Sequence, residues 1–120
     1  MKRQYRLRRP KDFQRVRSKG NLQDDARLTI TVAPARQRLA RCGIVVARRH
    51  GGAVVRNRIK RRIKEAIRLQ YAHIKGNVDL VFVVKSRALQ ALPFPKLLDL
   101  VASLLRRAGV YTQADDAATE

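Results

Sequence analysis

Apolar residues recur at helical spacing in three segments of this chain. The clearest segment runs from residue 53 to about residue 71, where five apolar side chains fall on one stripe of a helix: Val55, Ile59, Ile63, Ala66 and Ile67. Shorter helices are predicted at 10–19 and 95–107, because each begins at a proline and is followed within two residues by a glycine. One face of the long helix is therefore expected to pack on a core.

Three other segments have the pattern of β-strands. Residues 28–32 read Leu-Thr-Ile-Thr-Val, and this strict alternation predicts a strand with one buried face and one solvated face. Residues 42–47 and 78–85 are more uniformly apolar, which predicts more deeply buried strands. The element order is then α-β-β-α-β-α, which indicates an α+β fold with at least three strands.

The length of 120 residues suits a single domain, which we place at residues 1–109. Residues 110–120 contain three carboxylates among small side chains and no basic residue, so we expect a disordered acidic tail there. The longest clean apolar stretch, residues 80–84, is far too short to span a bilayer. Cys42 is the only cysteine, which excludes an intramolecular disulfide. These features together favour a cytoplasmic protein.

Charge narrows the class of partner. The chain has 28 Lys and Arg against 9 Asp and Glu, a net charge of +19, and its pI is about 11.7. A hydrophobic content of 45% supports a packed domain and argues against a charged, disordered chain. Residues 26–64 hold twelve basic residues and no carboxylate. A folded array of cations of this kind predicts a nucleic-acid partner ahead of an anionic membrane surface.

On the long predicted helix, basic residues surround the apolar stripe on its other sides. Asn57, Arg61, Lys64 and Arg68 follow one another at i, i+4, i+7 and i+11, opposite that stripe. No carboxylate precedes Glu65, so the like charges have no i,i+4 partner to offset their repulsion. This favours binding of a polyanion over an ordinary solvated helix face.

The approach to this helix offers another candidate phosphate contact. Arg48, Arg49 and His50 follow a predicted strand, and Gly51 and Gly52 precede the helix. Free N–H groups at a helix start can bind phosphate, and glycines permit a close approach. Alternatively, Gly52 merely starts the helix, and the sequence leaves the two interpretations open. His50 is interpreted as an added phosphate contact.

Three stretches, in order and at matching spacings, resemble the protein subunit of bacterial ribonuclease P, with the likeness covering about residues 4–108. They are Asp12-Phe13-Gln14-Arg15-Val16 with Gly20 after a basic N-terminus, the strand from Gly43 to Arg49 that ends in two cations, and Ala53 to Arg61 with its central Arg56-Asn57-Arg58. The last stretch is the most specific part of the resemblance.

The resemblance implies a small two-layer α/β sandwich similar to domain 2 of ribosomal protein S5, in which a β-α-β crossover carries the Arg-Asn-Arg helix. It also implies that the chain binds the catalytic RNA subunit of ribonuclease P and the 5′ leader of precursor tRNA, and so assists endonucleolytic removal of the leader. Catalysis, with its magnesium ions, would belong to the RNA. The chain is accordingly expected to hold no catalytic residue, metal site or cofactor of its own.

Carried over residue by residue, the resemblance implies two contact surfaces. The RNA surface comprises Arg48, Arg49, Arg56, Asn57, Arg58, Lys60, Arg61, Arg62, Lys64 and Arg68. The leader cleft comprises Phe13, Arg15, Arg17 and Thr31. Because Arg17 and Thr31 stand where the family often has aromatic residues, leader binding is expected to depend more on charge here. Phe13 can equally be a core residue that anchors a short helix.

A catalytic site within the chain itself is disfavoured. A two-metal nuclease site needs several convergent carboxylates, whereas those before the tail are scattered among cations. Neither His50 nor His73 stands in a recognisable catalytic pattern, and Cys42 lies in an apolar strand as a small core residue would. The alternative left open is a ribosomal or general RNA-binding protein. DNA and a membrane are not expected as partners.

Overall fold

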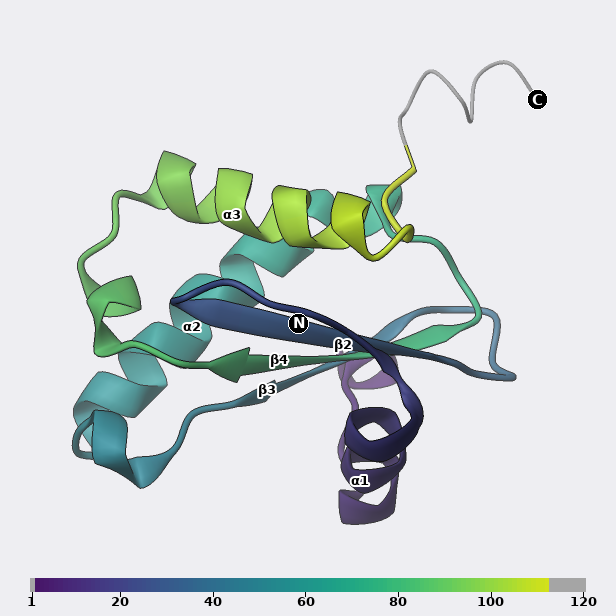
Figure 1. Ribbon diagram of the computed structural model, residues 1–120, viewed down its shortest axis with the longest axis horizontal. Helices are drawn as coiled ribbons and strands as arrows, with labels where there is room; N and C mark the ends of the chain where they lie inside the picture. The colour runs from purple at the N-terminus through teal and green to yellow at the C-terminus, as the bar shows by residue number, and fades with distance from the viewer. Residues whose placement is uncertain (1, 113–120) are drawn as a thin grey trace.

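A four-stranded sheet lies between the helices of the molecule (Figure 1). The computed structural model describes residues 2–112. The strands are β1 (Asn21–Gln23), β2 (Leu28–Pro34), β3 (Arg41–Val45) and β4 (Val78–Val84). Their order in the sheet is β1-β2-β4-β3, with β2 antiparallel to both of its neighbours and β3 parallel to β4. The two edge strands are therefore β1 and β3.

The three helices are α1 (Pro10–Lys19), α2 (Ala53–Gln70) and α3 (Phe94–Arg107). The α2 and α3 helices pack on one face of the sheet, and α1 lies on the other (Figure 1). Short 3-10 turns occur at η1 (Arg3–Tyr5), η2 (Arg48–His50), η3 (Tyr71–His73) and η4 (Arg87–Gln90). Each predicted helix and strand is thus confirmed to within two residues at either end, and the predicted α+β fold is confirmed.

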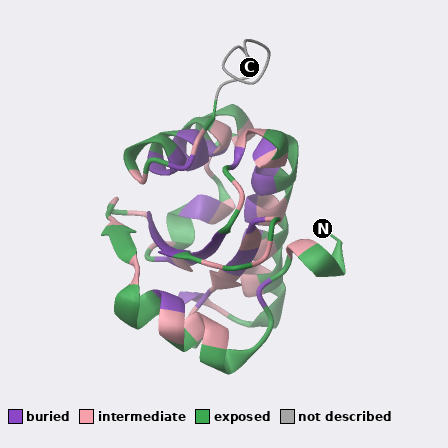
Figure 2. Ribbon diagram, turned by 90° about the vertical axis from the view of Figure 1, so that its right-hand side faces the viewer, coloured by how far each residue is buried: buried purple, intermediate pink, exposed green. Residues whose placement is uncertain are grey.

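Two hydrophobic clusters hold these layers together, and Figure 2 shows their buried residues along the inner faces of the helices and strands. The larger cluster lies between the sheet and α2 and α3, with Phe82, Ile59 and Leu104 at zero exposure. The smaller one lies under α1 and includes Val16 and Val81. Burying each such side chain stabilises the fold by about 1.5–3 kcal/mol. The predicted apolar stripe of the long helix supplies one wall of the larger cluster.

The crossover between the parallel strands determines where α2 lies. Parallel neighbours need a long connection, and α2 forms that connection between β3 and β4. The predicted β-α-β unit carrying the Arg-Asn-Arg segment is therefore confirmed. Since the helix buries Ile59, Ile63 and Ile67 against the sheet, most of its basic residues lie on its other faces.

One expectation about the sheet is wrong. The alternating strand was predicted to have a solvated face, but Thr29 and Thr31 of β2 are only 7% and 4% exposed. The sheet is covered on this side as well, because α1 packs on β2 and β4. The strand β1 was not predicted at all, since it has three residues and its Leu22 is exposed.

The start of the predicted acidic tail is packed on the domain. Val110 is 5% exposed, Tyr111 forms a β-bridge with Ile74, and the Thr112 N–H donates to the His73 carbonyl. The rest of that segment, residues 113–120, lies outside the described residues.

Candidate nucleic-acid interface

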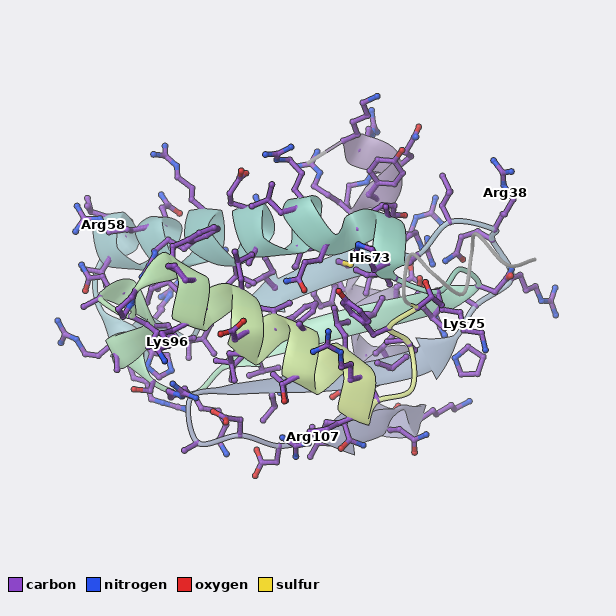
Figure 3. The ribbon with its side chains drawn as sticks, turned by 90° about the horizontal axis from the view of Figure 1, so that it is seen from above. Arg38, Arg58, His73, Lys75, Lys96 and Arg107 are labelled. Carbon is purple, nitrogen blue, oxygen red and sulfur yellow. The ribbon has the colours of Figure 1, made fainter. Side chains whose placement is uncertain are left out.

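The outward face of α2 carries a dense array of cations. Asn57, Arg58 and Arg61 are exposed, and Lys60 and Lys64 are partly exposed. Within residues 2–112, no carboxylate oxygen lies within 4 Å of a side-chain nitrogen of these four cations. Figure 3 shows the labelled Arg58 projecting outward near the start of the helix. The helix therefore presents uncompensated positive charge to solvent.

Three other predicted RNA-binding arginines have partners within the protein. The Arg62 guanidinium donates to the carbonyls of Leu89 (2.6 Å), Gln90 (2.8 Å) and Leu92, and so binds α2 to the η4 segment. Arg56 Nε donates to the Gly51 carbonyl at 3.1 Å. Arg68 pairs with Glu65 through two hydrogen bonds, of 2.9 and 2.5 Å. Sequence spacing alone does not distinguish these arginines from the solvated ones.

The segment before α2 adds two more exposed cations, Arg48 and Arg49 of η2. Gly52 is the N-cap residue of α2, and no side chain caps the first N–H groups of the helix. His50 was expected to contact phosphate, but it is only 6% exposed. Its Nε2 has no hydrogen-bond partner among the described residues. Burial leaves little of this ring for direct contact with a ligand.

The predicted leader cleft lies where α1 meets the sheet. The Phe13 ring packs on Gly43 of β3, and a Cβ added at that glycine would stand 2.4 Å from Phe13 Cζ. The glycine thus allows the ring to lie directly on the sheet. Arg17 is exposed beside a surface cavity of about 590 Å³ that Phe13 also lines. Thr31 is packed against Gly20, so little of it is open to a bound strand.

A narrow groove joins the α1 side of the molecule to α2. This cavity of about 180 Å³ lies where the N-terminal segment bridges β3, and four cations line it: Arg6, Arg8, Lys60 and Lys64. Phe13 and Gly43 form part of its wall. Like charge is crowded here. The pKa of Arg8 is lowered, first by the charge of Arg3, then by slight burial and by the charges of Arg6 and Arg9. Such crowding favours a bound polyanion.

Arg15, predicted to line the cleft, takes part in an ion-pair network around the buried Asp79. It donates to Asp79 of β4 and, at 3.1 Å, to the Pro34 carbonyl. Arg41 donates twice to the same carboxylate, at 2.9 and 2.8 Å, and Gln37 donates at 2.9 Å. Burial raises the pKa of Asp79, but the hydrogen bonds and charges of these partners outweigh it and hold the pKa below its ordinary value. The network fixes α1 to the sheet.

The described residues offer no evident centre for metal chemistry. No group of three or more His, Cys, Asp or Glu side chains among them is placed to hold a metal ion. Burial, followed by the charge of Asp79, raises the pKa of the Cys42 thiol to about 12, so this buried cysteine stays protonated. In the same part of the chain, no helix is both long and apolar enough to cross a bilayer.

Comparisons with known proteins identify the family of the chain. A family model described as Ribonuclease P matches residues 1–109. The ribonuclease P protein component of Roseiflexus castenholzii is 54% identical over 114 residues, which cover 95% of this chain and 93% of that relative. The protein component of Chloroflexus aurantiacus is 48% identical over 108 residues, covering 90% of this chain and 80% of the relative. The chain belongs to the ribonuclease P protein family.

Solved structures of this family share the fold. The RNase P protein of Staphylococcus aureus superposes with a TM-score of 0.80 at 26% identity, covering 90% of this chain and 98% of that one. The protein from Thermotoga maritima gives a TM-score of 0.77 at 26% identity, covering 85% and 96%. The four-stranded sheet with three helices is therefore the architecture of bacterial ribonuclease P proteins.

Family membership establishes the role of the chain at a coarse level. Ribonuclease P proteins take part in processing of the tRNA 5′ leader, as the protein component of an endoribonuclease whose catalytic centre lies in RNA. An RNA partner follows from this, and the alternative of a ribosomal or general RNA-binding protein is not favoured.

The buried Asp79 network and the Arg62 contacts are structural features that the sequence did not predict. An Asp within an apolar strand, with basic residues on other segments, was the only available signal for the network.

Proposed function

We propose that this chain binds the catalytic RNA subunit of ribonuclease P through α2 and η2, and that α1 and the adjoining sheet hold the 5′ leader of precursor tRNA. The RNA-subunit surface consists of Arg48, Arg49, Arg56, Asn57, Arg58, Lys60, Arg61 and Lys64. Arg62 supports this surface indirectly, because its side chain holds α2 to η4. Arg68 belongs to its far end, paired with Glu65.

The observation that carries the proposal is the uncompensated charge on α2. The helix has seven basic residues and a single carboxylate, Glu65, which already pairs with Arg68. Repulsion among the remaining cations weakens the free protein, and phosphates would relieve it while counterions are released from the RNA. Asn57 stands among the exposed cations and can both donate to and accept from a nucleotide.

The leader site is supported by the exposed Arg17 and by the half-buried Phe13 ring next to the cation-lined groove. A strand held there would meet charge and one aromatic surface. Magnesium ions of the holoenzyme would bind RNA, because phosphate oxygens suit this hard cation. The chain would then need no cofactor of its own, and we place the complex in the cytoplasm.

Replacing two exposed cations of α2 tests the RNA-subunit surface. The double variant R58A/R61A should bind the RNA subunit about 10- to 100-fold more weakly, because charge-assisted contacts each contribute about 1 kcal/mol or more. The matched control is R36A/R38A, which removes the same charge from the connection between β2 and β3. Figure 3 shows Arg38 at the end of the molecule opposite Arg58.

Binding is measured by filter retention of labelled RNA subunit, and cleavage of precursor tRNA is followed with the reconstituted holoenzyme. Circular dichroism should show all variants folded, because neither pair forms a side-chain hydrogen bond with another described residue. Equal loss of affinity in both double variants would show that only net charge matters and would overturn the assignment to α2.

A further inference from the structure

A cavity of about 590 Å³ lies between the N-terminal η1 turn and the C-terminal end of α2. Its lining residues are Lys2, Tyr5, Arg68, Tyr71 and Ala72. We propose that this cavity holds an unpaired nucleobase of the RNA subunit, stacked on Tyr5. The inference rests on the proposed function, since it requires that the same RNA lies along α2. Its volume is within the range of small-ligand sites, which suits a single nucleotide.

Two tyrosines give the cavity a fixed aromatic surface. The ring centroids of Tyr5 and Tyr71 are 4.5 Å apart, with an angle of 39° between the ring planes. The Tyr71 hydroxyl donates to the Ala40 carbonyl at 2.6 Å, which fixes that ring. The segment after Tyr5 is attached to the sheet, because the Leu7 N–H donates to the Cys42 carbonyl at 2.9 Å. An aromatic surface fixed in advance loses little conformational entropy when a base stacks on it.

The charge around the cavity suits a nucleotide. Lys2 is exposed at its rim, and Arg3 and Arg6 are exposed on the same N-terminal segment. The nearest carboxylate in the sequence of α2, Glu65, is bound by both hydrogen bonds of Arg68. A phosphate attached to the stacked base would therefore meet net positive charge.

The cavity is also continuous with the proposed RNA surface. The polar line of Asn57, Arg61, Lys64 and Arg68 runs along α2 and ends at the cavity, which Arg68 lines. These positions span about 17 Å of helix, at 1.5 Å per residue. An RNA segment that contacts Arg58 can thus extend along the helix and reach Tyr5.

The geometry points to the RNA subunit as the source of the base, and not to the leader. Tyr71 packs on the core cluster beneath α2 and α3, whereas Phe13 packs on the cluster under α1. The two sites therefore lie on different sides of the sheet. The base is unpaired because stacking on a protein side chain requires that the nucleotide leaves its helix or lies in a loop.

A single tryptophan tests this site directly. The chain contains no Trp, so Tyr5→Trp places one fluorescent reporter at the cavity without removing the aromatic surface. Titration of this variant with the RNA subunit should quench its fluorescence, with a Kd within about threefold of the unsubstituted chain. Unchanged fluorescence at saturating RNA would overturn the proposal, because no base would then lie against residue 5.

Affinity provides the second measurement. Tyr5→Leu keeps an apolar side chain but removes the aromatic ring, and it should weaken RNA-subunit binding by roughly 5- to 100-fold, the range expected for loss of one stacked base. Tyr5→Phe should bind as the unsubstituted chain does. If Tyr5→Leu keeps full affinity, or if Tyr5→Phe loses as much as Tyr5→Leu, stacking is excluded.

The two proposals fail separately. If R58A/R61A binds the RNA subunit normally, the surface on α2 is wrong, whatever the Tyr5 variants do. If that double variant is weakened while Tyr5→Leu is not, the α2 surface stands and the nucleobase site falls. The Tyr5→Trp titration remains decisive should Tyr5→Leu prove unstable, because its readout needs only a folded protein.

Discussion

Asp79 is fully buried and still charged, because Arg15, Arg41 and Gln37 donate to its carboxylate. Removing one member of such a network leaves the other charges without their partner, and this costs more than the network contributes as a whole. The cost is reduced here since the side chains of Arg15 and Arg41 are 34% and 29% exposed and can be partly hydrated. Asp79 therefore holds α1 on the sheet.

We expect Asp79→Asn to lower the free energy of unfolding by about 2–3 kcal/mol at pH 7. Because the folded pKa lies below the ordinary value of 3.8, the stabilisation is present above that value and is lost as pH falls through the folded pKa. Urea unfolding at pH 7 and at lower pH should show the difference between the two chains shrinking in acid.

The control for this substitution is Asp24→Asn, which removes an exposed ion pair with Lys85. Its cost should stay below about 1 kcal/mol. Equal destabilisation by the two substitutions would contradict the structural role of Asp79.

Arg61 and Arg62 are neighbours with different tasks. Arg61 is exposed, whereas Arg62 donates to backbone carbonyls of the η4 segment. We expect Arg62→Ala to lower the free energy of unfolding by about 1.5–3 kcal/mol, because it leaves these acceptors without a charged donor. Arg61→Ala should change stability by less than about 0.5 kcal/mol and instead weaken RNA binding.

Thermal unfolding and RNA-subunit affinity, measured on both single variants, separate the two roles. A stable Arg62→Ala chain would mean that its carbonyl contacts contribute little. The sequence could not have separated these residues, since both fall in one basic run and the carbonyls that distinguish them lie 27 or more positions further along the chain.

At the scale of elements, helical periodicity was a reliable guide where the buried stripe is long. α2 has four apolar or small residues at zero exposure, and its predicted start at Ala53 is confirmed. α1 buries only Val16 fully, so its sequence does not reveal which surface it covers. For this reason the covered outer face of β2 was missed. Its threonines are polar, and the helix that buries them docks through Gly20, Gly43 and the Asp79 network.

The docking of α1 gives a prediction about Gly43. We expect Gly43→Ala to cost about 1–3 kcal/mol, because the new Cβ would lie 2.4 Å from Phe13 Cζ and force the ring off the sheet. The matched control is Gly52→Asn, where nothing lies within 4 Å of an added Cβ and an asparagine can cap α2.

The control should change stability by only a few tenths of a kcal/mol. Chemical denaturation of the two variants checks this pair. If Gly43→Ala is as well tolerated as Gly52→Asn, the Phe13 ring is not fixed on β3 as the structure describes.

At the scale of the whole molecule, the basic residues that give the net charge of +19 have different roles. Some cations bind partners within the fold, at Asp79 and η4, whereas a dense group of others lies on α2, on η2 and in the groove beside β3. Composition alone predicted a polyanion partner, but only the folded chain shows which cations remain available to it. The family resemblance supplied the identity of that partner class, which charge cannot specify.

The most direct test of the account is the salt dependence of RNA-subunit binding. With six or more phosphate contacts, the affinity of the unsubstituted chain should fall about a thousandfold or more between 50 and 200 mM salt. In R58A/R61A the slope of log K against log salt should be smaller in magnitude by about 1–2, while R36A/R38A should keep the full slope. A flat salt response of the unsubstituted chain, or an equal reduction of slope in both double variants, would contradict the claim that α2 binds the RNA through its exposed cations.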